Sequence, residues 1–167
     1  MITGQISRTA IVDDRAKLDN NVTVWHFVQI REGVEIGANT IIGKGAYIGR
    51  NVKIGKNCKI GNNAQIFEGV IIQDGVFIGP CVCFTNDRHP AAVNKDGSLK
   101  GCNDWFLLGT LVESGASIGA NSTIVCGVSV GENSLVGAGS VVIKNVRRNT
   151  VVVGNPAKVK EGLSRGK

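Results

Sequence analysis

Residues 34–63 read VEIGAN TIIGKG AYIGRN VKIGKN CKIGNN, five consecutive hexads with isoleucine at the third position of each. The same register runs from Ile6 to Phe84 through 14 apolar residues at steps of six, without a polar interruption. It resumes at Val112 and continues to Val142. Because a helix repeats every 3.6 residues and an ordinary strand every two, a period of six indicates an internal structural repeat.

The other hexad positions are also regular. The first is small or β-branched, and the sixth is often glycine or asparagine, which tolerate a left-handed backbone best. Each hexad therefore predicts a short strand followed by a sharp corner, and stacked hexads bury a column of aliphatic side chains. This pattern predicts an all-β parallel β-helix. It resembles the left-handed form, in which three hexads make a triangular coil of about 18 residues, and the chain has enough hexads for about six to seven coils.

The chain is predicted to be a single domain, 1–167, with a loop insertion at about 88–109 and a tail at about 146–167. Helical periodicity is missing, and only residues 157–163 leave room for a short helix. The sequence predicts neither a signal peptide nor a membrane segment. The five cysteines include no CxxC pair and are interpreted as reduced thiols, so the protein is expected in the cytoplasm.

The net charge of +6 lies largely near the C-terminus. A basic surface can bind nucleic acid, but aromatic residues make up only 5% of the chain and no nucleic-acid-binding motif is present. We therefore predict no nucleic-acid partner and interpret the charge as a site for phosphorylated small molecules. The alternative is a solvated basic tail that includes Arg165 and Lys167.

The repeat fails between Asp87 and Thr110, where the sequence is RHPAAVNKDGSLKGCNDWFLLG. A long loop in a compact repeat protein is usually functional, so this one is predicted to project from a corner and fold over a ligand. A tolerated insertion is the alternative. Its last six residues can be read as a degenerate hexad with Phe106 pointing inward.

Asn86 belongs to the corner FTND, residues 84–87, from which this loop starts. Glu68 lies three hexads earlier, which is one predicted coil, so the two side chains are expected to stack on one outer edge. Two outward polar side chains beside a long loop predict a small-molecule site. An ordinary corner asparagine, like Asn63, is the alternative.

A second candidate site is an edge lined by small residues. Gly119 and Ala120 precede Gly137 and Ala138 by one predicted coil, so the two pairs are expected to stack and leave a smooth channel with exposed backbone amides. A long, thin, amide-bearing ligand such as pantetheine fits this channel. Three cations are expected at its upper end to meet phosphates, namely Lys144, Arg147 and Arg148. Corner packing and a soluble surface are the alternatives.

Five motifs carry a family resemblance: VWHF (24–27), GPCVCFTND (79–87), GASIGANSTIVCG (115–127), VGAGSVV (136–142) and VVVGNPAKV (151–159). Over nearly its whole length the chain resembles the left-handed β-helix nucleotide-aminosugar N-acetyltransferases. The resemblance implies acetyl-CoA as co-substrate, a UDP- or dTDP-linked amino sugar as acceptor, and a role in surface polysaccharide (O-antigen) biosynthesis. It also implies a homotrimer with active sites between subunits, in which CoA lies along the C-terminal coils.

By resemblance, Asn86 holds the amino group of the acceptor beside the thioester, and an acidic residue at the place of Glu68 is common. The chain departs from the pattern after the loop proline, where Ala91 stands in place of a frequent arginine. If that arginine binds a sugar carboxylate in relatives, Arg88 and Arg31 are the candidates to do so here, or the sugar differs.

Other functions on this fold need different residues. A hexapeptide O-acetyltransferase uses histidine as general base toward a hydroxyl. His89 lies in the loop, can reach the site and is a candidate catalytic residue. His26, in an early coil, can meet the substrate or the subunit interface, but a structural role is the more common one. A carbonic anhydrase needs three histidine ligands and the chain has two, so no metal site is predicted. Nucleotidyltransferases with similar hexads carry a further nucleotide-binding domain. A non-catalytic scaffold needs neither the loop nor the small-residue edge.

Overall fold

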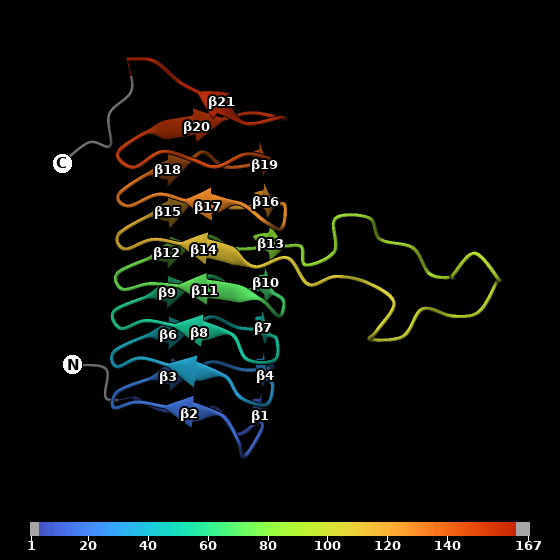
Figure 1. The fold of residues 1–167 in the computed structure, drawn as a ribbon. Coiled ribbons are helices and arrows are strands. Elements are labelled where there is room, and N and C mark those ends of the chain that lie inside the picture. Colours follow the sequence, from blue (N-terminus) through green and yellow to red (C-terminus); the bar gives the residue numbers. More distant parts are fainter. Residues whose placement is uncertain (1–3, 163–167) are drawn as a thin grey trace.

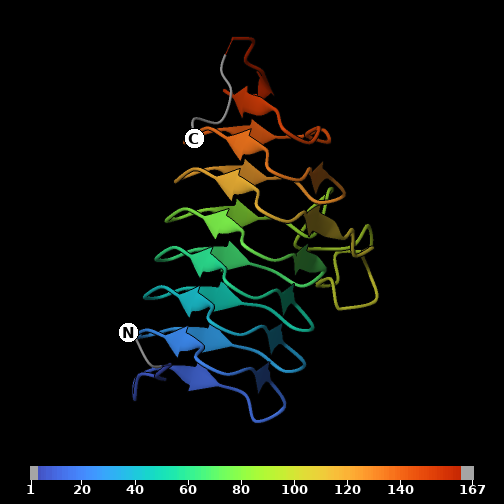
Figure 2. The same cartoon turned by 90° about the vertical axis from the view of Figure 1, so that its left-hand side faces the viewer.

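The computed structural model describes residues 4–162 and shows a column of three β-sheets, which we call faces A, B and C (Figures 1 and 2). In each coil the chain passes from face A to face B to face C, and it winds left-handed. The predicted all-β, left-handed parallel β-helix is therefore confirmed. Each corner line is named by the two faces it joins, as the A–B, B–C and C–A edges.

The faces are ladders of two- and three-residue strands. Face A contains β3 (Thr23–Val24), β6 (Ile41–Ile42), β9 (Lys59–Ile60), β12 (Phe77–Ile78), β15 (Ser117–Ile118), β18 (Leu135–Val136), β20 (Val151–Val153) and β21 (Lys158–Val159). Face B contains β1 (Ile11–Val12), β4 (Gln29–Ile30), β7 (Tyr47–Ile48), β10 (Gln65–Ile66), β13 (Cys83–Phe84), β16 (Thr123–Ile124) and β19 (Val141–Val142). Face C contains β2 (Lys17–Leu18), β5 (Glu35–Ile36), β8 (Lys53–Ile54), β11 (Val70–Ile72), β14 (Thr110–Val112) and β17 (Ser129–Val130).

The register shows where extra residues enter the column. Below the loop, each residue pairs with the one three hexads further on, as in Ile30 with Ile48. Ile72 instead pairs with Val112, so the coil that joins these two residues is longer than the others. The predicted insertion at 88–109 accounts for the extra length. Figure 1 shows this segment leaving the column as one long loop between β13 and β14.

Side chains at the third hexad position fill the column. Ile48, Ile66 and Phe84 have no exposed surface, because each is enclosed by the coils above and below. The expectation that Phe106 points inward is wrong, since its side chain is 89% exposed. The coil re-enters the column only at β14, where Val112 occupies the buried position.

Left-handed residues close the corners, as the sixth hexad position predicts. Asn39 has φ 60° and Gly45 has φ 69°. Phe27 (φ 59°) and Cys81 (φ 58°) adopt the same conformation without being asparagine or glycine. The left-handed conformation costs such residues about 1–2 kcal/mol each. Both lie on the A–B edge.

The short helix that residues 157–163 could have formed is not present in the described part of the tail. In its described part, Lys158 and Val159 form β21, which pairs antiparallel with β20 on face A. Leu163, Arg165 and Lys167 lie outside the described residues, so the interpretation of a solvated tail concerns a segment beyond them. Residues 4–162 contain no helix that could span a membrane.

Thr110 offers a test of the packing at the B–C edge. Its Oγ1 is buried and, among residues 4–162, has no hydrogen-bond partner, whereas Val70 and Val128 occupy this position in the adjacent coils. We expect Thr110→Val to raise the free energy of unfolding by about 1 kcal/mol, because the unpaired hydroxyl is removed. Thermal denaturation measures the change.

Thr40 provides the matched control on the C–A edge. Its Oγ1 accepts a hydrogen bond from Cys58 N–H (3.0 Å) and donates one to Gly55 O (2.9 Å). Thr40→Val is expected to lower the free energy of unfolding by about 1–3 kcal/mol, since it leaves both partners unpaired. A lower Tm in Thr110→Val than in the unchanged protein contradicts the interpretation of Thr110.

Candidate functional site

The long loop is closed at its neck, and Asn86 stands there. Thr85 Oγ1 accepts a hydrogen bond from Cys126 N–H (3.0 Å), and Asn86 O accepts one from Leu108 N–H (3.4 Å). The first bond ties the start of the loop to the coil above, and the second joins the outgoing and returning segments of the loop at the B–C edge. The Asn86 backbone is therefore fixed while its side chain stays partly exposed.

The loop beyond this neck is ordered by its own polar groups. Asp104 Oδ2 accepts hydrogen bonds from Gly101 N–H (2.7 Å) and Asn94 Nδ2 (3.1 Å), and these bonds lower the pKa of Asp104. Lys100 N–H donates to Ala92 O (3.0 Å), so the two halves of the loop are held side by side. The loop thus has a defined shape although it contributes no strand.

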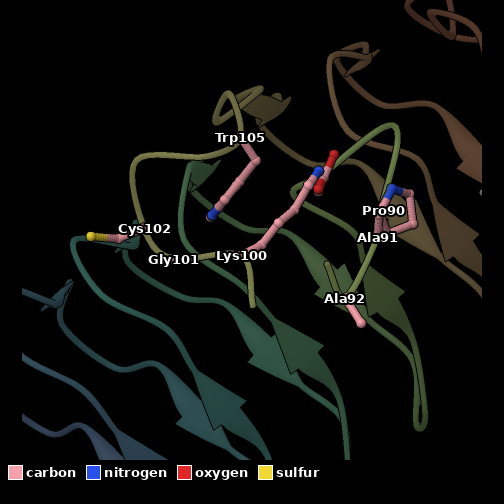
Figure 3. Close-up of a pocket in the computed structure, with 8 residues that line it drawn as sticks. Pro90, Ala91, Ala92, Lys100, Gly101, Cys102 and Trp105 are labelled. Carbon is pink, nitrogen blue, oxygen red and sulfur yellow. The ribbon is translucent and has the colours of Figure 1, made fainter. Parts of the chain in front are cut away.

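Two cavities open at the base of the loop. The first, of about 580 Å³, is lined by Asp87, Pro90, Ala91, Ala92, Lys100, Gly101, Cys102 and Trp105. Figure 3 shows the Lys100 side chain extending between Trp105 and Pro90. The second, of about 450 Å³, is lined by Asp87, Arg88, His89, Lys100, Asp104, Trp105, Phe106 and Leu108. Both cavities are bordered by the same three residues, Asp87, Lys100 and Trp105, so an acidic side chain, a basic side chain and an indole ring lie between them.

His89 and Arg88, both predicted site residues, line the second cavity. His89 is exposed, and its backbone N–H donates a hydrogen bond to Asp87 Oδ1 (2.8 Å), which fixes the start of the loop. Arg88 reaches toward the coil above, because its Nη1 lies 3.9 Å from the place a Cβ on Gly127 would take. His89 is therefore positioned to meet a ligand in the cavity, and Arg88 lies above the level of Asn86.

Glu68 lies directly below Asn86 on the B–C edge, one coil down, because Gln65 pairs with Cys83. Its Oε1 accepts a hydrogen bond from Asn51 Nδ2 (3.4 Å), in the next coil down. The register thus places the two predicted residues on one edge beneath the loop.

Arg31 is on the same edge but much lower, three coils below Thr85 and hence about 14 Å away. Its Nε donates to Glu32 Oε2 (3.0 Å), and Arg50 Nε pairs with Glu32 Oε1 (2.6 Å). Arg31 is therefore not beside Asn86. The two arginines and Glu32 form a charged cluster at the foot of the edge.

The sequence reasoning missed several residues of this region. Arg50 follows from the three-hexad spacing, since it lies one coil above Glu32, and that spacing could have found it. The ring pair Tyr47–Phe67, with centroids 5.4 Å apart, is offset from that spacing, because Tyr47 pairs with Gln65. Lys100 and Trp105 carry no such signal, because the loop has no repeat.

The Gly/Ala channel lies on a different edge, A–B. Ala120 and Ala138 stack there, and their backbone N–H groups make no hydrogen bond within residues 4–162. By contrast, Lys44 N–H at the same corner position donates to Asn62 Oδ1 (3.0 Å) in the coil above. Ala138 has no side-chain acceptor, so the Ala120 N–H is unpaired within the described residues. The Ala120 carbonyl accepts a hydrogen bond from Gly139 N–H (2.8 Å).

Glycines let successive coils approach closely along this edge. A Cβ on Gly119 would lie 2.4 Å from Ala138 N, and a Cβ on Gly137 would lie 2.7 Å from Val153 Cγ1. Gly119 N–H is not free, because it donates to Val136 O (2.8 Å). The edge therefore presents small side chains and the amide of Ala120, as a thin ligand requires.

The expected position of the three cations is wrong for a single chain. Lys144 lies on the B–C edge, just before the bridge of Val146 to Val130 on face C. Arg147 and Arg148 follow on the C–A edge, where Arg148 Nη2 pairs with Glu132 Oε2 (3.2 Å). At the top of the channel stands Lys158 instead, which pairs with Val153 directly above Gly137.

No cluster of three or more potential metal-ligating side chains is present in residues 4–162.

Comparisons with known proteins agree with the fold. The bacterial transferase hexapeptide model (six repeats) matches residues 15–50, 51–86 and 109–144. The N-acyltransferase AntD from Bacillus cereus, solved with dTDP and coenzyme A, is 19% identical with a TM-score of 0.67, over 95% of this chain and 81% of that one. No curated protein sequence matches the chain.

Two further solved structures are similar. Perosamine N-acetyltransferase from Caulobacter crescentus, solved with CoA and GDP-perosamine, is 22% identical with a TM-score of 0.57, and the match spans 95% of this chain but only 57% of that protein. A hexapeptide-repeat acetyltransferase from Vibrio cholerae, solved with acetyl coenzyme A, is 26% identical with a TM-score of 0.55, over 80% and 72% of the two chains. Since the family repeats cover well over half of the 167 residues, the chain belongs to the bacterial transferase hexapeptide family.

Proposed function

We propose that this protein is an acetyl-CoA-dependent N-acetyltransferase that acylates the amino group of a nucleotide-linked amino-deoxy sugar, with UDP or dTDP as the nucleotide, in surface polysaccharide biosynthesis. The observation that carries the proposal is the matched height of two sites. Ala120 lies one coil above Pro80, and Asn86 follows Pro80 by one hexad along the rising coil, so Asn86 and Ala120 differ by about two thirds of a coil, about 3 Å, in height. The similar structures that hold CoA together with a nucleotide or nucleotide sugar support it.

The two sites lie on different edges of one column, so one chain does not bring them together. We therefore include a homotrimer in the proposal. A closed three-fold arrangement parallel to the column sets the A–B edge of one subunit beside the B–C edge of the next at equal height. Exposed apolar side chains on the loop support this, since Leu99 is 81% and Phe106 89% exposed in a single chain.

The five cysteines are all unpaired, which fits a reducing compartment such as the cytoplasm.

The reaction needs alignment more than a strong base, because a thioester is activated and a sugar amine is substantially unprotonated near neutral pH. The Asn86 side chain accepts a hydrogen bond from the amine and directs its lone pair at the acetyl carbonyl carbon. Ala120 N–H is the candidate donor to the oxyanion that forms. As the C–N bond forms and the C–S bond breaks, the leaving thiolate takes the proton released by the amine.

A panel of nucleotide sugars tests the proposed function. UDP- and dTDP-linked 3-amino and 4-amino sugars are supplied with acetyl-CoA, and free thiol is followed. We expect thiol release that requires both substrates and stops when a hydroxyl replaces the amine. Transfer to the hydroxyl sugar would support the O-acetyltransferase with His89 as base. Failure to bind CoA in calorimetry would favour a non-catalytic scaffold.

A further inference from the structure

One corner of the A–B edge, residues 25–27, differs from the corners above it. Trp25 is 40% exposed and Phe27 is 65% exposed. In the five coils above, the position of Trp25 is glycine, at Gly43, Gly61, Gly79, Gly119 and Gly137. The chain therefore places two exposed aromatic rings where the repeat elsewhere uses small residues.

Phe27 also holds a backbone conformation that its side chain disfavours. Its φ is 59°, and the coils above use Gly45 and Asn63 at this position. An asparagine here would relieve the strain and keep the fold. The exposed ring removes little apolar surface from water, so packing within the chain does not account for the choice.

His26, between the two rings, is held in place by the coil below. Its Nδ1 lies 2.8 Å from Ser7 Oγ and 3.0 Å from Thr9 Oγ1, and Thr9 Oγ1 also accepts a hydrogen bond from Phe27 N–H (3.3 Å). The His26 and Phe27 ring centroids are 6.1 Å apart. Two hydroxyls thus fix one side of the imidazole and leave Nε2 for another partner.

We propose that Trp25, His26 and Phe27 bind the nucleobase of the nucleotide sugar, an inference that rests on the proposed function. Aromatic rings bind any base by stacking, and a fixed imidazole adds a hydrogen bond to the base edge.

Heights along the column support the assignment. The corner lies three coils, about 14 Å, below the coil that carries Asn86, a distance that two phosphates and a ribose span. Between them, one coil above His26, the exposed Lys44 is placed to meet the phosphates. Arg31 lies at the height of the aromatic corner on the B–C edge, which the proposed trimer brings alongside.

Fluorescence gives a direct test, because Trp25 and Trp105 are the two tryptophans of the chain. Trp105→Phe leaves Trp25 as the sole reporter, and UDP, dTDP and GDP are titrated into this variant. At least one nucleotide is expected to quench Trp25 to saturation. Adding Phe27→Asn is expected to raise the Kd of that nucleotide roughly tenfold, since one stacking ring is lost. It is also expected to raise Tm by roughly 2–4 °C, because asparagine accepts the left-handed corner.

Cys81→Asn is the matched control. Cys81 has the same conformation on the same edge, three coils higher, so this variant should raise Tm equally and leave the Kd unchanged. An unaltered Kd in Phe27→Asn overturns the proposal, and so does a change of oligomeric state on gel filtration, which would make the corner a subunit contact. Acetyl transfer without quenching of Trp25 rejects the corner and spares the proposed function. Quenching of Trp25 without acetyl transfer to any amino sugar supports the nucleobase corner and rejects the proposed function.

Discussion

Asn86→Ala is expected to lower kcat for acetyl transfer by about 100-fold or more and to change KM for the nucleotide sugar little. The amine then loses the acceptor that directs its lone pair, and misalignment of a reacting atom by about 1 Å costs this much. Asn86→Asp is expected to be milder, because a carboxylate oxygen also accepts the hydrogen bond. Steady-state kinetics with the amino sugar selected by the substrate panel measures both variants.

The Asn86 variants have a structural control. The loop neck depends on the backbone carbonyl of Asn86, which bonds Leu108 N–H, so the substitutions should leave Tm unchanged. His89→Ala is measured alongside, since His89 borders the same loop cavity. We expect its pH–rate profile to parallel that of the unchanged protein. Wild-type turnover in Asn86→Ala, with a flattened profile in His89→Ala, would transfer the catalytic role to the histidine.

The column was predictable from sequence because its packing is periodic. Each inward isoleucine must meet its equivalent in the next coil, as Ile48 meets Ile66, and each left-handed corner must be filled by a tolerant residue. The same rule predicts that Glu68 lies beneath Asn86, as the pairing of Gln65 with Cys83 shows. At these positions the conformational preference of each residue agrees with the place that the coil register assigns to it.

The three-hexad register also excludes positions: it shows that Lys144 cannot lie at the top of the Gly/Ala channel. The step from Ala120 to Lys144 is one coil and one further hexad, so the register alone assigns Lys144 to another edge. Its expected place at the top of the channel followed from closeness in sequence, which a triangular coil does not preserve. Lys158 reaches that region because β21 folds back antiparallel on β20, a reversal that no hexad predicts.

The loop cavities were beyond sequence reasoning for a different reason. Asp87, Lys100 and Trp105 meet because the loop doubles back, with Val93 bridged to Leu99 and Asp104 holding Gly101. These contacts depend on single turns and side-chain bonds. Phe106 lies six residues before Val112, so the hexad spacing predicts an inward side chain there, but the chain re-enters the column only at β14 and leaves Phe106 exposed.

Ala138→Trp is expected to abolish CoA binding measured by calorimetry. The side chain at 138 is already exposed, so the larger residue should not disturb the core, but it would cover the channel and the Ala120 N–H. Ala138→Asn distinguishes the loss of the Ala120 N–H as a donor from the steric block that a tryptophan causes. Its amide oxygen can accept the Ala120 N–H as Asn62 Oδ1 accepts Lys44 N–H, and we expect roughly tenfold weaker binding of CoA.

Mixing two inactive variants tests whether each site is shared between subunits. Asn86→Ala damages the B–C edge, and Ala138→Trp blocks the A–B edge of a different chain. In trimers refolded from equal amounts of both, about a quarter of the sites should combine an intact B–C edge with an intact A–B edge. Activity is therefore expected to recover to about a quarter of the wild-type value, although each variant alone is nearly inactive. A mixture no more active than its separate components would mean that both halves of a site come from one chain, which the column's geometry does not allow without moving the loop across face B.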